Sequence, residues 1–132
     1  MDCIFCKIIN KEIPSTIVYE DESVIAFKDL NPVAPVHILV VPNENLSSYA
    51  YNPERAQDIL TNMGYKLANG IRKKEDIELM GKVLYTCKEI AASLPECDGG
   101  YRIINNCGDN AGQTVKHIHF HIIGGKEMLN LI

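Results

Sequence analysis

The chain has 132 residues, a formal net charge of −4 and a pI of about 5.5, and 46% of its residues are hydrophobic. This length and apolar content suit one hydrophobic core, so a single domain over residues 1–132 is expected. The acidic balance excludes a general affinity for nucleic acid, which needs a basic surface. No apolar run approaches the roughly 18 residues that a membrane span requires, so no membrane association is expected.

The N-terminal residues 1–6 lack the charged and apolar regions of a secretion signal. The chain contains five cysteines, an odd number that favours free thiols over a disulfide framework. Free thiols are typical of a reducing compartment, and we therefore expect a cytoplasmic protein.

The first elements predicted along the chain are strands. Residues 17–19 and 24–27 are rich in β-branched and aromatic side chains, and three acidic residues separate them, which predicts a hairpin. Residues 37–41 form an apolar run that predicts a buried strand, and this strand is expected to end at Pro42.

The middle of the chain is predicted to be helical. Asn52 followed by Pro53 is typical of a helix start, and apolar residues then recur at helical spacing, at Ile59, Met63, Leu67 and Ile71. Residues 72–76 are charged and predict a solvated connection. A second helix is expected to carry the apolar residues Ile77, Met80, Leu84, Cys87, Ala91 and Leu94 and to end before Pro95.

The C-terminal third predicts two more strands. A glycine-containing turn over residues 98–100 precedes a predicted strand at 101–104, and residues 115–123 predict a second one. The order of strands, then helices, then strands favours an α+β fold with an antiparallel sheet over a repeated βαβ arrangement.

Histidines alternate with apolar residues in the last of these strands. The chain has four histidines, and three of them are His117, His119 and His121. Alternate residues of a strand point to one face, so the three imidazoles should line one face. The other face is then apolar and packs into the core, through Ile118, Phe120 and Ile122. The fourth histidine, His37, lies in the predicted strand 37–41.

Three interpretations of this pattern are open. The histidines can be ordinary structural residues, although strict alternation opposite an apolar face makes this the weaker interpretation. They can form a zinc site, since zinc accepts imidazole nitrogens. The third interpretation is nucleophilic attack at phosphorus, because the polar loop 106–114 enters the strand and its backbone N–H groups are suited to an anion.

The segment His117-Ile118-His119-Phe120-His121-Ile122-Ile123 resembles the signature of the histidine triad (HIT) family. Segments elsewhere resemble the same family in the expected order, and the residues after the triad, 124–128, resemble its purine nucleoside phosphoramidase branch. The resemblance implies a single HIT domain in which helices pack on a roughly five-stranded antiparallel sheet. It also implies a homodimer whose sheets join across a helix and strand interface.

The resemblance further implies a catalytic role for all four histidines: His37, His117, His119 and His121. His119 corresponds to the nucleophile, which attacks the α-phosphorus and forms a nucleotidyl-histidine that water then hydrolyses. His121 is expected to contact the phosphoryl oxygens, while His117 and His37 belong to a hydrogen-bonded relay that holds the tautomer of the nucleophile.

A nucleotide pocket is carried over in the same way. The carboxylate of Asp29 corresponds to the group that binds the ribose hydroxyls. The residues that correspond to an apolar slot for the base are Ile4, Phe5, Ile8, Phe27 and Leu30. Those that correspond to phosphate contacts are Asn106, Gly112, Gln113 and Thr114. Two positions in this loop depart from the common pattern, with Ala111 in place of glycine and Thr114 in place of serine.

The expected function is hydrolysis of a phosphoramidate or phosphoanhydride bond of a purine nucleotide with release of AMP, without a cofactor. The alternatives are a dinucleoside polyphosphate hydrolase, a nucleotide-binding scaffold with weak catalysis, and a zinc-binding protein. Some relatives use a pair like Cys3 and Cys6 with the first triad histidine as zinc ligands. Here Asn45 stands where such relatives have their fourth ligand, so we expect no metal.

Overall fold

The computed structural model describes residues 4–42, 74–115 and 117–130. A short helix α1 (Ile4–Ile9) is followed by strands β1 (Ile17–Glu20), β2 (Val24–Lys28) and β3 (Val36–Pro42). After the long helix α4 (Lys74–Ala92) come a 3₁₀ turn η1 (Pro95–Cys97), strand β4 (Tyr101–Ile104), a second 3₁₀ turn η2 (Asp109–Ala111) and strand β5 (Phe120–Gly124). The predicted helix over 52–71 lies outside the described residues.

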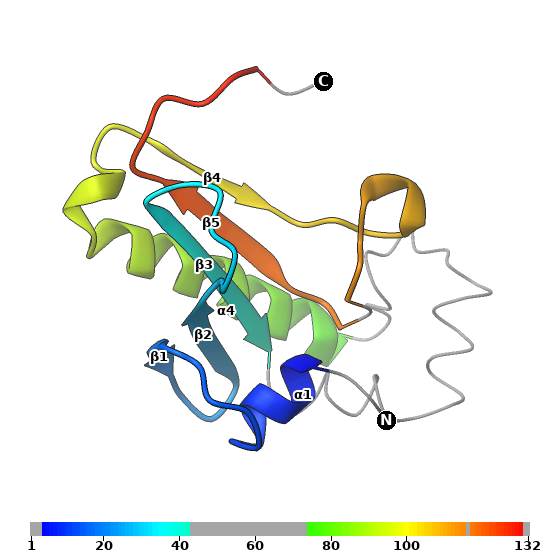
Figure 1. Cartoon of the computed structure of the whole chain (residues 1–132). Coiled ribbons are helices and arrows are strands. Elements are labelled where there is room, and N and C mark those ends of the chain that lie inside the picture. Colours follow the sequence, from blue (N-terminus) through cyan, green and yellow to red (C-terminus); the bar gives the residue numbers. More distant parts are fainter. Residues whose placement is uncertain (1–3, 43–73, 116, 131–132) are drawn as a thin grey trace.

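The five strands form one sheet in the order β1-β2-β3-β5-β4, and each adjacent pair is antiparallel. β5, which is far along the chain, pairs with both β3 and β4 and therefore joins the two halves of the sheet (Figure 1). The α+β class and the five-stranded antiparallel sheet predicted from the sequence are confirmed.

The two faces of the sheet carry separate apolar clusters, because alternate residues of each strand point to opposite sides. In β3, Val36, Ile38 and Val40 belong to the cluster under α4, together with Ile118 and Ile122. Leu39 and Val41 belong to the cluster on the other face, which α1 covers with Phe5 and Ile8. Figure 1 shows α4 behind the sheet and α1 in front of it. The alternation predicted around the histidines is therefore confirmed on its apolar side.

Helix α4 begins earlier than the sequence indicates. Residues 74–76 were expected in a connection, but the helix starts at Lys74. Apolar spacing begins only at Ile77, so it cannot reveal a first turn built from charged residues, although Lys and Glu are good helix formers. At the other end, the helix stops at Ala92, and Leu94 packs against the core from the segment beyond it.

The histidine strand is shorter than predicted. Residues 115–123 were expected to be extended throughout, but β5 begins only at Phe120 and ends at Gly124. The first paired residue is Phe120, which lies opposite Val40 of β3. Upstream of that point the backbone is engaged elsewhere, since the carbonyls of His117 and His119 accept hydrogen bonds from side chains. Competition from side chains, which spacing alone does not show, ends the ladder here.

The short helix α1 was not predicted, because six residues are too few for helical periodicity to be visible. Among the described residues, no helix combines the length and the apolar character needed to cross a bilayer.

Candidate active site

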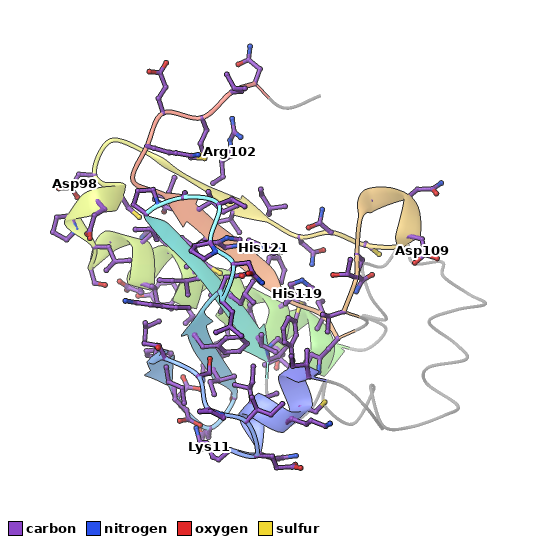
Figure 2. All side chains as sticks on the ribbon, viewed as in Figure 1. Lys11, Asp98, Arg102, Asp109, His119 and His121 are labelled. Carbon is purple, nitrogen blue, oxygen red and sulfur yellow. The ribbon has the colours of Figure 1, made fainter. Side chains whose placement is uncertain are left out.

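The four histidines lie on the same face of the sheet as α1. His37 comes from β3, His121 from β5, and His117 and His119 from the segment just before β5. The rings of His119 and His121 are 5.0 Å apart, and the ring of Phe5 meets that of His119 edge-on at 4.9 Å. His119 and His121 lie close to the centre of the sheet in Figure 2. Only 5% of the surface of His119 is exposed.

The backbone determines the tautomer of His119. Its Nδ1 is 2.7 Å from the carbonyl oxygen of His117, which can only accept a hydrogen bond, so Nδ1 carries the proton. In a neutral imidazole the other nitrogen then holds a lone pair. His119 therefore presents Nε2 as a nucleophilic or metal-binding atom, without any base needed to deprotonate it.

His117 is held in place from two sides. Its Nε2 is 3.2 Å from the carbonyl oxygen of Pro42, so this nitrogen donates, and Nδ1 accepts from the Cys6 thiol at 3.3 Å. The His117 ring is 2% exposed and lies beside Phe5. This ring fixes the residue whose carbonyl oxygen orients His119. The sequence pattern gave no sign of the part played by the Pro42 carbonyl.

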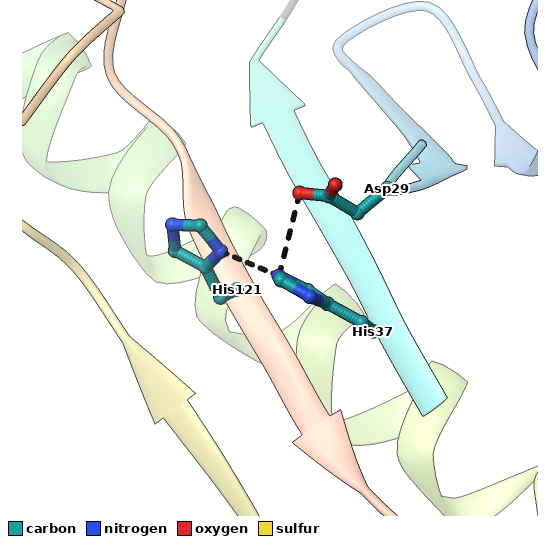
Figure 3. Close-up of side chains that lie close together, drawn as sticks. All are labelled: Asp29, His37 and His121. Carbon is teal, nitrogen blue, oxygen red and sulfur yellow. Dashed lines mark hydrogen bonds and ion pairs between the residues drawn. The ribbon is translucent and has the colours of Figure 1, made fainter. Parts of the chain in front are cut away.

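His37, His121 and Asp29 form a second group, which Figure 3 shows in close-up. The backbone N–H of Val33 donates to Nδ1 of His37 at 3.2 Å, so the ring proton of neutral His37 lies on Nε2. This Nε2 is 2.9 Å from Nδ1 of His121 and 3.4 Å from a carboxylate oxygen of Asp29. His121 therefore accepts on Nδ1 and carries its own proton on Nε2.

Burial keeps the triad imidazoles neutral. It lowers the pKa of His117 to about 4, although the bond to the Pro42 carbonyl opposes this shift. It lowers the pKa of His121 to about 4 as well, with a further contribution from the charges that His119 and His37 would carry. The pKa of His119 is also lowered by burial. At neutral pH the site thus offers a lone pair on His119 and an N–H donor on His121.

The loop before the histidines is braced by its own side chains. The amide of Asn106 donates to the carbonyl of Ala111 at 2.8 Å. The amide oxygen of Gln113 accepts from the N–H of Gly108, and its nitrogen donates to the carbonyl of Val115. Gly112 has φ of +82°, a conformation that glycine adopts without strain. Thr114 is exposed, whereas Gln113 is buried.

The predicted apolar slot divides into two groups. Ile4 and Leu30 are exposed, and Phe5 is the buried neighbour of His119. Phe5 also belongs to the core cluster on this face of the sheet, together with Ile8 and Phe27. Direct contact of these last two with a ligand stays a prediction. Asn105 was missed by the sequence analysis: its amide donates to the carbonyl of His119 at 2.9 Å.

Two groups of residues contain side chains of the kinds that bind metal ions. Within the described part of the chain, Asp29, His37 and His121 bring three possible ligand atoms within 4.8 Å of one another. The Val33 N–H bond places a proton on the His37 atom that would face the ion, which disfavours metal binding there. The second group is Cys6 and His117, which offer two ligand atoms, whereas a structural zinc site usually has four.

A cleft of about 590 Å³ lies between α4 and the hairpin β1–β2. Asp29 and His37 contribute to its wall, but the triad histidines do not. The cleft therefore meets the site at Asp29 and His37, and of the four histidines only His37 lines it.

Comparison with known proteins agrees with this geometry. The family model of the HIT domain matches residues 10–128. A maize protein named 14 kDa zinc-binding protein is 43% identical over 127 residues, which cover 95% of this chain and 83% of that protein. An Arabidopsis thaliana protein named adenylylsulfatase HINT1 is 42% identical over 127 residues, which cover 95% of this chain and 72% of that protein.

Among solved structures, a HIT family hydrolase from Legionella pneumophila is 33% identical, with a TM-score of 0.76 over 97% of this chain and 96% of that one. An open antiparallel sheet with a row of neutral imidazoles on one face thus defines the class of protein. The chain belongs to the HIT domain family and stands among its hydrolases.

Proposed function

We propose that the protein hydrolyses a phosphoramidate or phosphoanhydride bond of a purine nucleotide through a nucleotidyl-histidine on His119. The observation that carries this proposal is the bond from Nδ1 of His119 to the His117 carbonyl, which leaves the lone pair on Nε2. A lowered pKa keeps that lone pair available at neutral pH. A scaffold that only binds nucleotides has no need for an imidazole prepared in this way.

The reaction has two displacements at the α-phosphorus. Nε2 of His119 forms a bond to phosphorus while the bond to the leaving group breaks, and water later breaks the N–P bond and releases a nucleoside monophosphate. The Nε2–H of His121 donates to a phosphoryl oxygen where negative charge develops. A phosphoramidate is the easier substrate, because its nitrogen can take a proton from solvent and then leaves as a neutral amine.

The nucleoside end of the substrate is assigned to the rim of the same face. Asp29 binds the ribose hydroxyls, with its other carboxylate oxygen held by the N–H of Asn31 at 2.7 Å. The exposed apolar side chains of Ile4 and Leu30 offer a surface for a purine beside Phe5. The name of the Arabidopsis relative, an adenylylsulfatase, is in keeping with an adenylyl nucleotide as substrate.

The first experiment measures turnover of an adenosine phosphoramidate with an amine leaving group by wild type and by His119→Ala. We expect kcat to fall by roughly 10³-fold or more in the variant, since loss of a nucleophile removes the covalent route. Asp98→Ala is the control, because Asp98 is exposed and lies far from His119 (Figure 2). Turnover that survives in His119→Ala would exclude the covalent mechanism.

The same assay separates the rival enzyme and the binding scaffold. Faster turnover of a dinucleoside polyphosphate than of any phosphoramidate would favour the first rival. Binding of AMP without turnover of either substrate would favour the scaffold.

Zinc binding is the second candidate, and the buried pair of Cys6 and His117 is the observation that favours it. The maize relative carries zinc binding in its name. In this chain the completing positions are Cys3 and Asn45, both outside the described residues, and asparagine is not among the usual zinc ligands. We therefore expect well under one zinc per chain by elemental analysis after dialysis. One full equivalent would contradict this expectation.

A further inference from the structure

We propose that Asp29 is a positioning residue for His121, acting through His37, in addition to its contact with the ribose. This inference rests on the proposed function of the site. It gives Asp29 a second role, which is to prepare the N–H of His121 that donates to the phosphoryl oxygen. The contacts that carry it join three elements: the segment after β2, strand β3 and strand β5 (Figure 3).

The proton of His37 is the starting point. The N–H of Val33 points at Nδ1 of His37 from 3.2 Å, so Nδ1 must accept. Neutral His37 then has one proton, on Nε2. That proton faces two acceptors at once, Nδ1 of His121 at 2.9 Å and a carboxylate oxygen of Asp29 at 3.4 Å.

The carboxylate of Asp29 is oriented for this role. One oxygen, Oδ1, accepts the N–H of Asn31 at 2.7 Å, and this bond turns the other oxygen, Oδ2, toward His37. The Asp29 side chain is 21% exposed and that of His37 is 6% exposed, so water screens the contact only partly. A negative charge beside Nε2 stabilises the tautomer that carries the proton there.

The tautomer of His37 decides what His121 can do. With the proton on His37 Nε2, His121 accepts on Nδ1 and directs its own Nε2–H away from His37. If His37 carried its proton on Nδ1, it would clash with the Val33 N–H, and His121 would have to donate from Nδ1. A neutral His121 would then lose the N–H that we assign to the phosphoryl oxygen.

Asp29→Asn replaces the hydrogen-bond acceptor that faces Nε2 of His37 with a donor and changes little else. An amide oxygen can still accept the N–H of Asn31, but the NH₂ group then faces His37. Two donors would meet at Nε2, which favours the wrong tautomer. The substitution thus removes the charged acceptor while the side chain keeps almost the same shape.

The experiment uses two adenosine phosphoramidates, one with and one without the 2′ and 3′ hydroxyls. If Asp29 serves only the ribose, Asp29→Asn loses its effect on the substrate that lacks both hydroxyls. We expect instead that Asp29→Asn lowers kcat by roughly tenfold to a hundredfold on both substrates, the loss of one hydrogen bond to a charged group. The effect on KM should appear only with the complete ribose. Asp98→Asn is the matched control and should change neither constant.

A second measurement does not depend on turnover. The ¹⁵N chemical shifts of the His37 ring report which nitrogen carries the proton, and wild type should show it on Nε2. In Asp29→Asn the signal should move toward the Nδ1–H form. A wild-type proton on Nδ1, an unchanged signal in the variant, or a kcat effect confined to the complete ribose would each overturn the proposal. If wild type hydrolyses no nucleotide, the proposed function fails, and the ring signals still decide the role of Asp29.

Discussion

Backbone groups determine the tautomers of three of the four histidines directly. The Val33 N–H fixes His37, the His117 carbonyl fixes His119, and the Pro42 carbonyl fixes His117. His121 takes its tautomer from His37. Because an N–H can only donate and a carbonyl oxygen can only accept, these contacts decide which nitrogen of each ring is nucleophile, donor or acceptor.

The buried imidazoles make stability depend on pH. The pKa of His117 is about 4 in the folded protein and about 6.5 in an unfolded chain. Between these values the unfolded state binds more protons, so stability is complete above pH 6.5 and falls as the pH drops toward 4. We expect His117 alone to lower the free energy of unfolding by roughly 2 kcal/mol between pH 7.5 and 5.

Urea unfolding at the two pH values, in the presence of a chelator, checks this expectation. His117→Gln removes the titrating group and should give a smaller difference between the two pH values than wild type does. Equal pH dependence in wild type and variant would contradict the assignment.

At the scale of elements, the turn after β5 fixes the loop that carries Asp29. Gly125 has φ of +88°, and a Cβ at this position would lie 2.9 Å from Cβ of Pro35. Pro35 closes the segment between β2 and β3, which includes Asp29 and Val33. This close approach of the Gly125 backbone to the ring of Pro35 holds the loop against the end of the histidine strand.

Gly125→Ala is therefore expected to lower the free energy of unfolding by roughly 2 kcal/mol, from the left-handed backbone and the clash together. The matched control is Gly81→Ala in α4, where a Cβ meets nothing within 4 Å. That change should stabilise the protein by roughly 1 kcal/mol, because alanine favours helix over glycine. Thermal and urea unfolding of both variants measure whether each change raises or lowers the free energy of unfolding. Destabilisation by Gly81→Ala but not by Gly125→Ala would contradict both expectations.

At the scale of the whole molecule, one edge of the sheet is β4, and α4 carries an exposed Leu84. The family resemblance implies a homodimer that forms through a helix and a strand. We propose that two copies associate through α4 and β4, because apolar side chains on a helix surface gain from being covered.

Light scattering is expected to give twice the chain mass of 14.7 kDa. Leu84→Asp should weaken the dimer, whereas Val18→Asp on β1, at the opposite edge of the sheet, should leave it intact. A wild-type mass of one chain would rule out this association.

The sequence by itself determined the fold class, most of the strands, and the face on which the histidines lie. Alternation with a period of two gave the two faces of the histidine segment, and the spacing of the triad identified the family. It missed the first turn of α4 and the true start of β5, because neither charged helix starts nor side chains that bond to carbonyls leave a periodic signal.

Only the tertiary structure decided the chemistry of the individual rings. Pro42 and Cys6 contact His117 across long stretches of chain that no spacing rule connects. The contact of Val33 with His37 is local, but its geometry depends on the fold of the loop before β3. A sequence states that an imidazole is present, but its tautomer and its pKa depend on the neighbours that burial and hydrogen bonding supply. Pro42 and Cys6 come to His117, and His37 comes to His121, from distant parts of the chain, and only folding brings them together.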